Sequence, residues 1–169
     1  TFKDCTNLKS IIIPDSVTSI DVYAFANCTS LESIVIPDSV TSLSGAFYGC
    51  TALKNVTLSK NIDYIDGFWG CTSLESIEIP NSVTDIGWRA FNGCTSLTSI
   101  EIPNSVTFIG GDSYFGTGAF YNCSSLTSVI FEENSQLNAI ESGVFQGCSS
   151  LTSIEILNSV TFIGGDAYF

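Results

Sequence analysis

Seven cysteines are the residues of this chain best suited to chemistry, as metal ligands, disulfide partners or nucleophiles. They are Cys5, Cys28, Cys50, Cys71, Cys94, Cys123 and Cys148. Successive cysteines lie 21 to 29 residues apart, whereas the ligands of structural zinc sites usually come in closely spaced Cys-x-x-Cys pairs. The chain contains no histidine, so neither a Ser-His nor a Cys-His pair can form. We therefore predict no metal site, no cofactor and no enzymatic activity.

The cysteine spacing leaves two structural interpretations, a set of disulfides or a column of free thiols. If each interval forms one turn of a stack, neighbouring cysteines have Cα atoms about 5 Å apart, a separation that a disulfide tolerates. Stacked side chains point in parallel, however, and an odd number of cysteines cannot all pair. We expect a column of small, buried free thiols. On that interpretation the cysteine count does not indicate a redox compartment.

A repeat of about 23 residues surrounds each cysteine. A phenylalanine stands three residues before every cysteine: Phe2, Phe25, Phe47, Phe68, Phe91, Phe120 and Phe145. A leucine stands three residues after every cysteine, from Leu8 to Leu151. Two β-forming residues then alternate with outward positions, as in Ile34/Ile36, and predict a short strand. All four prolines follow this segment at one phase, where they end the strand: Pro14, Pro37, Pro80 and Pro103.

A single unit of this kind has no second layer against which to bury its apolar face. Stacked units cover one another and place equivalent residues in columns. The alternative fold, a β-sandwich, needs hairpin signals about every ten residues, and these are missing. The pattern predicts a repeat solenoid, mostly β and irregular, with one short parallel β-strand per turn. We expect residues 1–169 to form a single solenoid of about seven turns, a fragment of a longer array without caps.

The repeat motif is best preserved over residues 79–109, which contain I-P-N-S-V-T-x-I-G followed by A-F-x-G-C-T-S-L-T-S-I. This pattern resembles the BspA-type (Treponema-type) leucine-rich repeat, and the resemblance extends over the whole chain. It implies a leucine-rich-repeat horseshoe or right-handed coil. It also implies an extracellular or cell-surface protein of bacteria or protists that binds host or matrix proteins, or other cells.

The charge of the chain restricts its partners. Five basic residues against seventeen acidic residues give a net charge of −12. An acidic chain without a basic cluster repels phosphate backbones and anionic lipid surfaces, so we expect no nucleic-acid partner. Its apolar runs are only a few residues long, which excludes direct membrane insertion by a helix. Cations and basic proteins remain possible partners.

The outward positions of the predicted strands form the candidate recognition strip. Its residues stand seven positions after each cysteine: Ile12, Val35, Thr57, Glu78, Glu101, Ile130 and Glu155. Glu78 and Glu101 should lie on adjacent strands, where like charges are unfavourable. A basic partner or a cation would relieve the repulsion, and calcium is the candidate cation because it prefers oxygen ligands. The alternative, which we expect, is a solvated acidic face.

Departures from the repeat supply a second set of candidate contacts. Aromatic residues follow the phenylalanine column at Tyr48, Trp69 and Tyr121, with Trp88 nearby, and could form a patch for a protein or a sugar. Packing on the turn side is the alternative. The longest interval contains a Gly-rich insertion at residues 110–118, either a loose bulge or a contact loop that presents Tyr114 and Phe115. Its opening recurs at residues 164–169.

Two functions are compatible with these features. The first is a non-catalytic scaffold for protein binding and adhesion, displayed on a cell surface or secreted, whose extended face contacts a protein partner. The second is a structural filament or matrix component that self-associates end to end, because uncapped solenoid ends present open strands.

Overall fold

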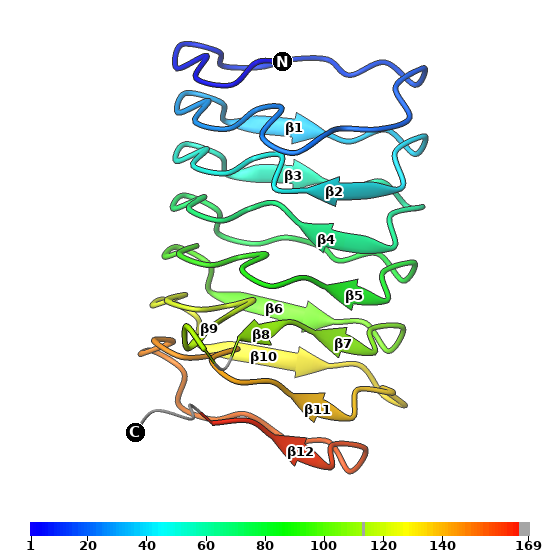
Figure 1. Cartoon of the computed structure of the whole chain (residues 1–169), viewed down its shortest axis with the longest axis vertical. Coiled ribbons are helices and arrows are strands. Elements are labelled where there is room, and N and C mark those ends of the chain that lie inside the picture. The colour runs from blue at the N-terminus through cyan, green and yellow to red at the C-terminus, as the bar shows by residue number, and fades with distance from the viewer. Residues whose placement is uncertain (113, 166–169) are drawn as a thin grey trace.

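The computed structural model describes residues 1–112 and 114–165 as one stack of short turns without a helix (Figure 1). The chain winds through about six turns. The predicted fold class is confirmed.

The first sheet consists of the strands that the repeat predicts. They are β1 (Ser33–Val35), β3 (Asn55–Thr57), β6 (Ser99–Ile102) and β10 (Ser128–Phe131). Strand β1 pairs with β3, and β6 pairs with β10, both in parallel. Their inward residues pair across turns, as Ile100 does with Val129, and both of these are buried. The outward residues on either side of them face the solvent, as a period of two requires.

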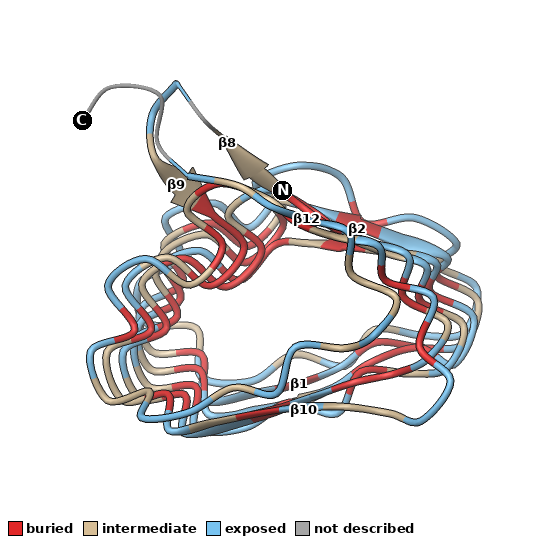
Figure 2. Cartoon of the chain, turned by 90° about the horizontal axis from the view of Figure 1, so that it is seen from below, coloured by how far each residue is buried: buried red, intermediate tan, exposed pale blue. Residues whose placement is uncertain are grey.

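A second parallel sheet lies on the opposite side of each turn (Figure 2). One part contains β2 (Ser42–Ser44), β4 (Tyr64–Asp66), β5 (Asp85–Ile86) and β7 (Phe108–Ile109), and another pairs β11 (Ala139–Ile140) with β12 (Phe162–Ile163). The prediction of one strand per turn is therefore wrong. Segments such as Val83–Ile86 bury their first and last apolar residues, but two or three strand residues give too little alternation for a strand signal.

The Gly-rich insertion forms a small antiparallel hairpin. Its strands are β8 (Gly111–Asp112) and β9 (Thr117–Gly118). The Asp112 carboxylate accepts hydrogen bonds from the backbone N–H groups of Tyr114 (2.7 Å) and Phe115 (3.2 Å). This hairpin projects beyond the outline of the stacked turns, on the side of the second sheet (Figure 2). Of the repeated opening at residues 164–169, only residues 164–165 lie within the described residues.

The seven phenylalanines that stand three residues before the cysteines form one continuous stack through the interior. Successive rings are nearly parallel, with centroids 5.3 to 5.7 Å apart. The four middle rings are fully buried: Phe47, Phe68, Phe91 and Phe120. Phe2 at one end is 44% exposed, because no ring covers its outer face. Offset stacking of buried rings adds to the free energy gained by burying them.

The residue before each cysteine adopts a left-handed backbone conformation in every turn. Its φ angle lies between 58° and 78° at Asp4, Asn27, Gly49, Gly70, Gly93, Asn122 and Gly147. Glycine, asparagine and aspartate are the residue types that tolerate this conformation best. The alternation of these types before the cysteine column therefore reflects a backbone requirement of the corner.

Candidate functional site

The cysteine column is a structural ladder of free thiols. Six of the seven thiols are buried, and only Cys5 is exposed. Each buried thiol donates a hydrogen bond to the backbone carbonyl of the repeat phenylalanine in the preceding unit, such as Cys94 to Phe68 (3.2 Å) and Cys123 to Phe91 (3.1 Å). The thiols thus satisfy carbonyls of the preceding turn in place of forming disulfides.

Burial makes these thiols poor nucleophiles. Desolvation raises the pKa of Cys50 from 9.0 to about 12 and that of Cys148 to about 11, in each case against the opposing effect of the backbone hydrogen bond. The pKa values of Cys71 and Cys94 are raised well above 9.0 for the same reason. Because the thiolate is the reactive form, the column supports packing and not catalysis.

All seven residues of the candidate recognition strip are exposed, and four of them stand on strands of the first sheet: Val35, Thr57, Glu101 and Ile130. Val35 pairs directly with Thr57, and Glu101 pairs directly with Ile130. Its apolar members are unusually accessible, with Ile12 93%, Val35 62% and Ile130 52% exposed. The strip is therefore a mixed column of aliphatic and acidic side chains.

A groove of about 530 Å³ interrupts this face between two turns. Glu78 and Glu101 line it together with Glu132. Within the described residues, Ser76–Ile79 forms no strand with its neighbours, so the sheet is open beside Glu78. No group of three or more His, Cys, Asp or Glu residues in the described part of the chain could hold a metal ion. The sequence pattern did not predict Glu132 as a lining residue. It stands at the repeat position that proline occupies in four other turns.

The aromatic candidates separate into two groups. Tyr48 and Trp69 are in ring contact, with centroids 4.7 Å apart, and Tyr23 extends the row on the other side of Tyr48 at 6.1 Å. Tyr114 and Phe115 contact each other at the hairpin tip (4.8 Å), and Phe115 reaches Trp88 at 6.3 Å. Tyr121 shares the phase of Tyr48 and Trp69 but is not among the residues that line the groove described next.

Arg89 joins the two groups. Its Cζ atom lies 4.7 Å from the centroid of the Trp69 ring and 4.0 Å from that of the Trp88 ring. Both distances permit attraction between the cation and the aromatic faces. Arg89 Nε is buried and has no hydrogen-bond partner among the described residues. The Trp88 indole is held by its own N–H, which donates to the Thr117 hydroxyl (2.9 Å) on β9.

These side chains line a groove of about 280 Å³ at the edge of the second sheet, which we call the aromatic groove. Its principal lining residues are Tyr23, Tyr48, Asp66, Trp69, Trp88 and Arg89. Burial raises the pKa of the Asp66 carboxyl, while a long hydrogen bond from the Tyr64 hydroxyl (3.5 Å) opposes part of that rise. Sequence reasoning missed Tyr23, Asp66 and Arg89. Arg89 could have been recognised as a candidate from the sequence, because it is the single basic residue after Lys60.

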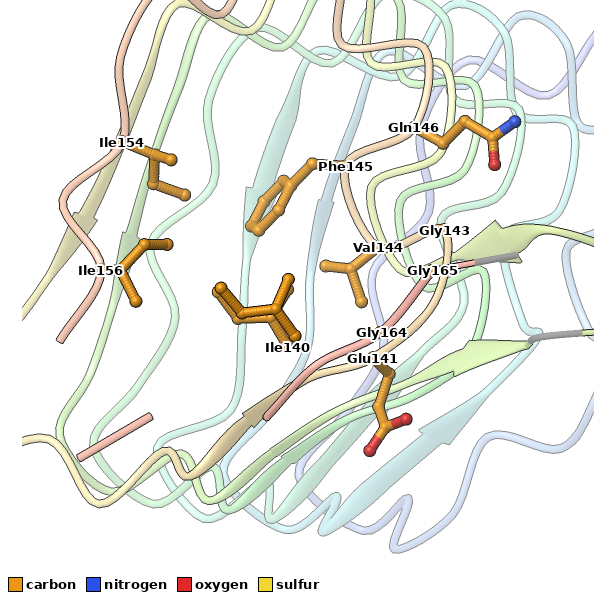
Figure 3. Close-up of a pocket in the computed structure, with 11 residues that line it drawn as sticks. Ile140, Glu141, Gly143, Val144, Phe145, Gln146, Ile154, Ile156, Gly164 and Gly165 are labelled. Atoms are coloured by element: carbon orange, nitrogen blue, oxygen red, sulfur yellow. The ribbon is translucent and has the colours of Figure 1, made fainter. Parts of the chain in front are cut away.

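The two ends of the described stack expose interior side chains. Near the C-terminal end of the described residues, an open pocket of about 370 Å³ is lined by Ile140, Val144, Phe145, Ile154 and Ile156, whose side chains point into it (Figure 3). At the other end Phe2, Ile11 and Ile13 line a similar apolar space of about 380 Å³. Both end surfaces consist of apolar side chains that belong to the interior columns of the repeat. No helix in the described residues is long and apolar enough to cross a membrane.

Several solved structures share this fold. The leucine-rich repeat protein of T. pallidum is 33% identical, with a TM-score of 0.78 over 88% of this chain and 67% of that one. A leucine-rich repeat protein from Bacteroides ovatus is 29% identical, with a TM-score of 0.69 over 88% and 43%. A leucine rich cell surface protein from Faecalibacterium prausnitzii is 34% identical, with a TM-score of 0.66 over 85% and 35%.

The chain thus spans two thirds of the T. pallidum protein and less than half of the other two. No curated protein matches it. The model of the BspA type leucine rich repeat region matches in six copies, over residues 1–117 and 68–169. Its repeats are the units that build the phenylalanine and cysteine columns. The chain belongs to the BspA-type leucine-rich repeat family.

Proposed function

We propose that this chain is a non-catalytic scaffold that binds a protein partner through the recognition strip on its first sheet. The observation that carries the proposal is the exposure of Ile12, Val35 and Ile130, at 93%, 62% and 52%. Aliphatic side chains gathered on a regular, solvated face are favourable to bury against a partner. Stacked repeats provide such a face with little change in shape along the stack.

A non-catalytic role is supported by the chemistry of the chain. It contains no histidine, and its buried thiols have raised pKa values. The commonest general base is therefore missing from the chain. The buried thiols are held in the protonated form, which is not the nucleophile. Leucine-rich-repeat proteins are generally non-catalytic scaffolds.

We further propose that the scaffold acts in adhesion, on a cell surface or after secretion. The similar F. prausnitzii protein is described as a cell surface protein. The net charge of −12 and the acidic members of the strip favour a partner with a basic contact region, such as a host or matrix protein. We expect no nucleic-acid partner for the same electrostatic reason.

The test is binding of the purified chain to a panel of immobilised host-surface and matrix proteins. Val35→Asp and Ile130→Asp should each weaken the strongest interaction at least tenfold, because they place a charge in the centre of the apolar contact. The matched control is Ser42→Asp, an exposed position on the second sheet, which should leave the affinity within twofold. Unchanged binding by both strip variants would remove the strip from the interface.

The second candidate function is self-association through the ends of the stack. The open ends, with Phe2 at one and Phe145 at the other, favour it because each would be covered by another turn of the same repeat. A second copy would continue the ring stack and the backbone ladder. Sedimentation velocity of the purified chain distinguishes the candidates. A monomer at all concentrations excludes this candidate, whereas concentration-dependent growth into fibres supports it.

A further inference from the structure

We propose that the aromatic groove binds a neutral saccharide. This inference goes beyond the protein-binding function, because the groove lies at the edge of the second sheet and the recognition strip lies on the first. The two sheets are on opposite sides of each turn (Figure 2). Either surface can therefore fail its test without affecting the other.

Backbone strain is the first observation that sets this groove apart. The backbone is left-handed in several turns at the position two residues before the stacked phenylalanine. Gly45 and Gly143 occupy this position in two turns, with φ angles of 58° and 71°. Tyr23 and Arg89 occupy the same phase in other turns, with φ angles of 60° and 63°. Left-handed backbone is unfavourable for residues of these types. Strain of this kind concentrates at ligand sites, and both side chains line the groove.

The shape of the groove favours a small ring over a protein surface. Its volume of about 280 Å³ is near the lower end of small-molecule pockets, roughly 300 Å³. The walls are rings that pack against each other at an angle, Tyr23 on Tyr48 at 70° and Tyr48 on Trp69 at 54°. Such walls provide apolar surface for the C–H face of a sugar ring in a space too narrow for a folded partner.

The polar groups of the groove require a ligand that both donates and accepts hydrogen bonds. Arg89 supplies donors and no acceptor, and its Nε atom is buried without a partner among the described residues. Asp66 supplies carboxylate acceptors in the lining of the same groove. A purely apolar ligand would leave these groups unsatisfied. Sugar hydroxyls can satisfy both, since each hydroxyl donates one hydrogen bond and accepts two.

Charge selects a neutral sugar over an ionic one. The groove contains one cationic side chain, Arg89, and one anionic side chain, Asp66, so a neutral ligand meets a balanced site. A sialylated or sulfated glycan would be repelled by the net charge of −12. A cationic ligand would face the guanidinium of Arg89. The groove thus matches a neutral hexose or N-acetylhexosamine unit best.

The test is an array of immobilised glycans probed with the purified chain, with neutral, sialylated and sulfated glycans side by side. The neutral glycan that binds best is then titrated in solution, with tryptophan fluorescence and saturation-transfer NMR as readouts. We expect saturable binding in the micromolar to millimolar range and a change in the emission of Trp69 and Trp88. Exclusive binding to charged glycans, or no neutral glycan bound at millimolar concentration, would overturn the proposal.

Three variants locate the site. Trp69→Ala and Arg89→Gly should each weaken binding of that neutral glycan at least tenfold. Arg89→Gly is the decisive variant, because glycine fits the left-handed backbone and the fold is preserved while the side chain is lost. Tyr121→Ala is the matched control, an aromatic residue of the same phase as Trp69 that does not line the groove. Its affinity should stay within twofold, and equal losses in all three variants would contradict the assignment.

A strip variant separates this proposal from the proposed function. Ile130→Asp, which should weaken protein binding, should leave binding of the neutral glycan unchanged. If the aromatic groove belongs to a protein interface instead, Arg89→Gly will weaken binding to an unglycosylated protein partner, and no neutral glycan will compete. That outcome would overturn the saccharide assignment and leave the scaffold function in place.

Discussion

Individual phenylalanine rings hold the turns of this protein in register. Phe91 is fully buried and stacks on Phe68 at 5.7 Å and on Phe120 at 5.3 Å. Phe91→Ala removes a ring from the middle of this stack and leaves a cavity that fixed neighbours cannot fill. We expect a loss of roughly 3–5 kcal/mol in the free energy of unfolding, measured by chemical denaturation. A melting temperature within a degree of the wild-type value would show that the ring column is misassigned.

The thiol column predicts a loss of stability at alkaline pH. Burial raises the pKa of Cys50 from 9.0 to about 12 in the folded chain, so the unfolded chain releases this proton first. The contribution of the group to stability is therefore complete below about pH 9 and is lost as the pH rises from there towards 12.

The measurement is the free energy of unfolding between pH 8 and pH 11 under reducing conditions. Cys50→Ala should reduce the slope, because it removes one of the titrating groups, whereas Cys5→Ala should not, because Cys5 is exposed. A stability that is independent of pH over this range, or equal slopes in both variants, would contradict the burial of the column.

The roles of individual side chains could be predicted only in part from the sequence. The wide and regular cysteine spacing predicted a column of buried free thiols, which the structure contains. The contact of Tyr48 with Trp69 follows from their shared phase in neighbouring turns. Arg89 was not predictable in its present place, because its position over two indoles depends on a left-handed backbone residue and on the hairpin that fixes Trp88.

At the scale of elements, the first sheet has two glutamates close together at a place where strand pairing is interrupted. Glu78 and Glu101 line one groove, and the sheet is open beside Glu78. Glu101→Ser removes one of two like charges on adjacent turns, so it should change the free energy of unfolding by less than about 1 kcal/mol or increase it. A clear destabilisation would mean that Glu101 has a stabilising partner.

Calcium provides a separate check on the same groove. We expect millimolar calcium to leave the melting temperature unchanged, because no group of three potential ligands occurs in the described residues. A rise of several degrees that is abolished by Glu78→Gln would establish a cation site and contradict this prediction.

The sheets show where sequence patterns suffice and where they do not. The first sheet is predictable because inward residues such as Ile34 and Ile36 alternate with outward ones and a proline ends four of the seven segments. The second sheet escaped prediction because strands such as β5 (Asp85–Ile86) contain two residues, too few to establish a period. Strand pairing there is imposed by the stacking of turns and not by local preference.

For the whole molecule, the repeat dictates the architecture and leaves function to the departures from it. The columns of phenylalanine, cysteine and leucine recur in every unit, so they determine the fold of the family. Residues that vary between turns, such as those of the recognition strip and the aromatic groove, carry the proposed binding functions. Fold was therefore far easier to derive from the sequence than either binding surface.

The central claim is that one repeat forms one turn, so that equivalent side chains stack in columns. Insertion of a second copy of the 23-residue segment 72–94 directly after Cys94 tests it most directly. A whole added turn should be accommodated and should raise the melting temperature, because neighbouring turns stabilise one another. Insertion of residues 72–83 alone, about half a period, should instead disrupt every column beyond it and lower the melting temperature. Equal destabilisation by the two insertions would contradict the claim.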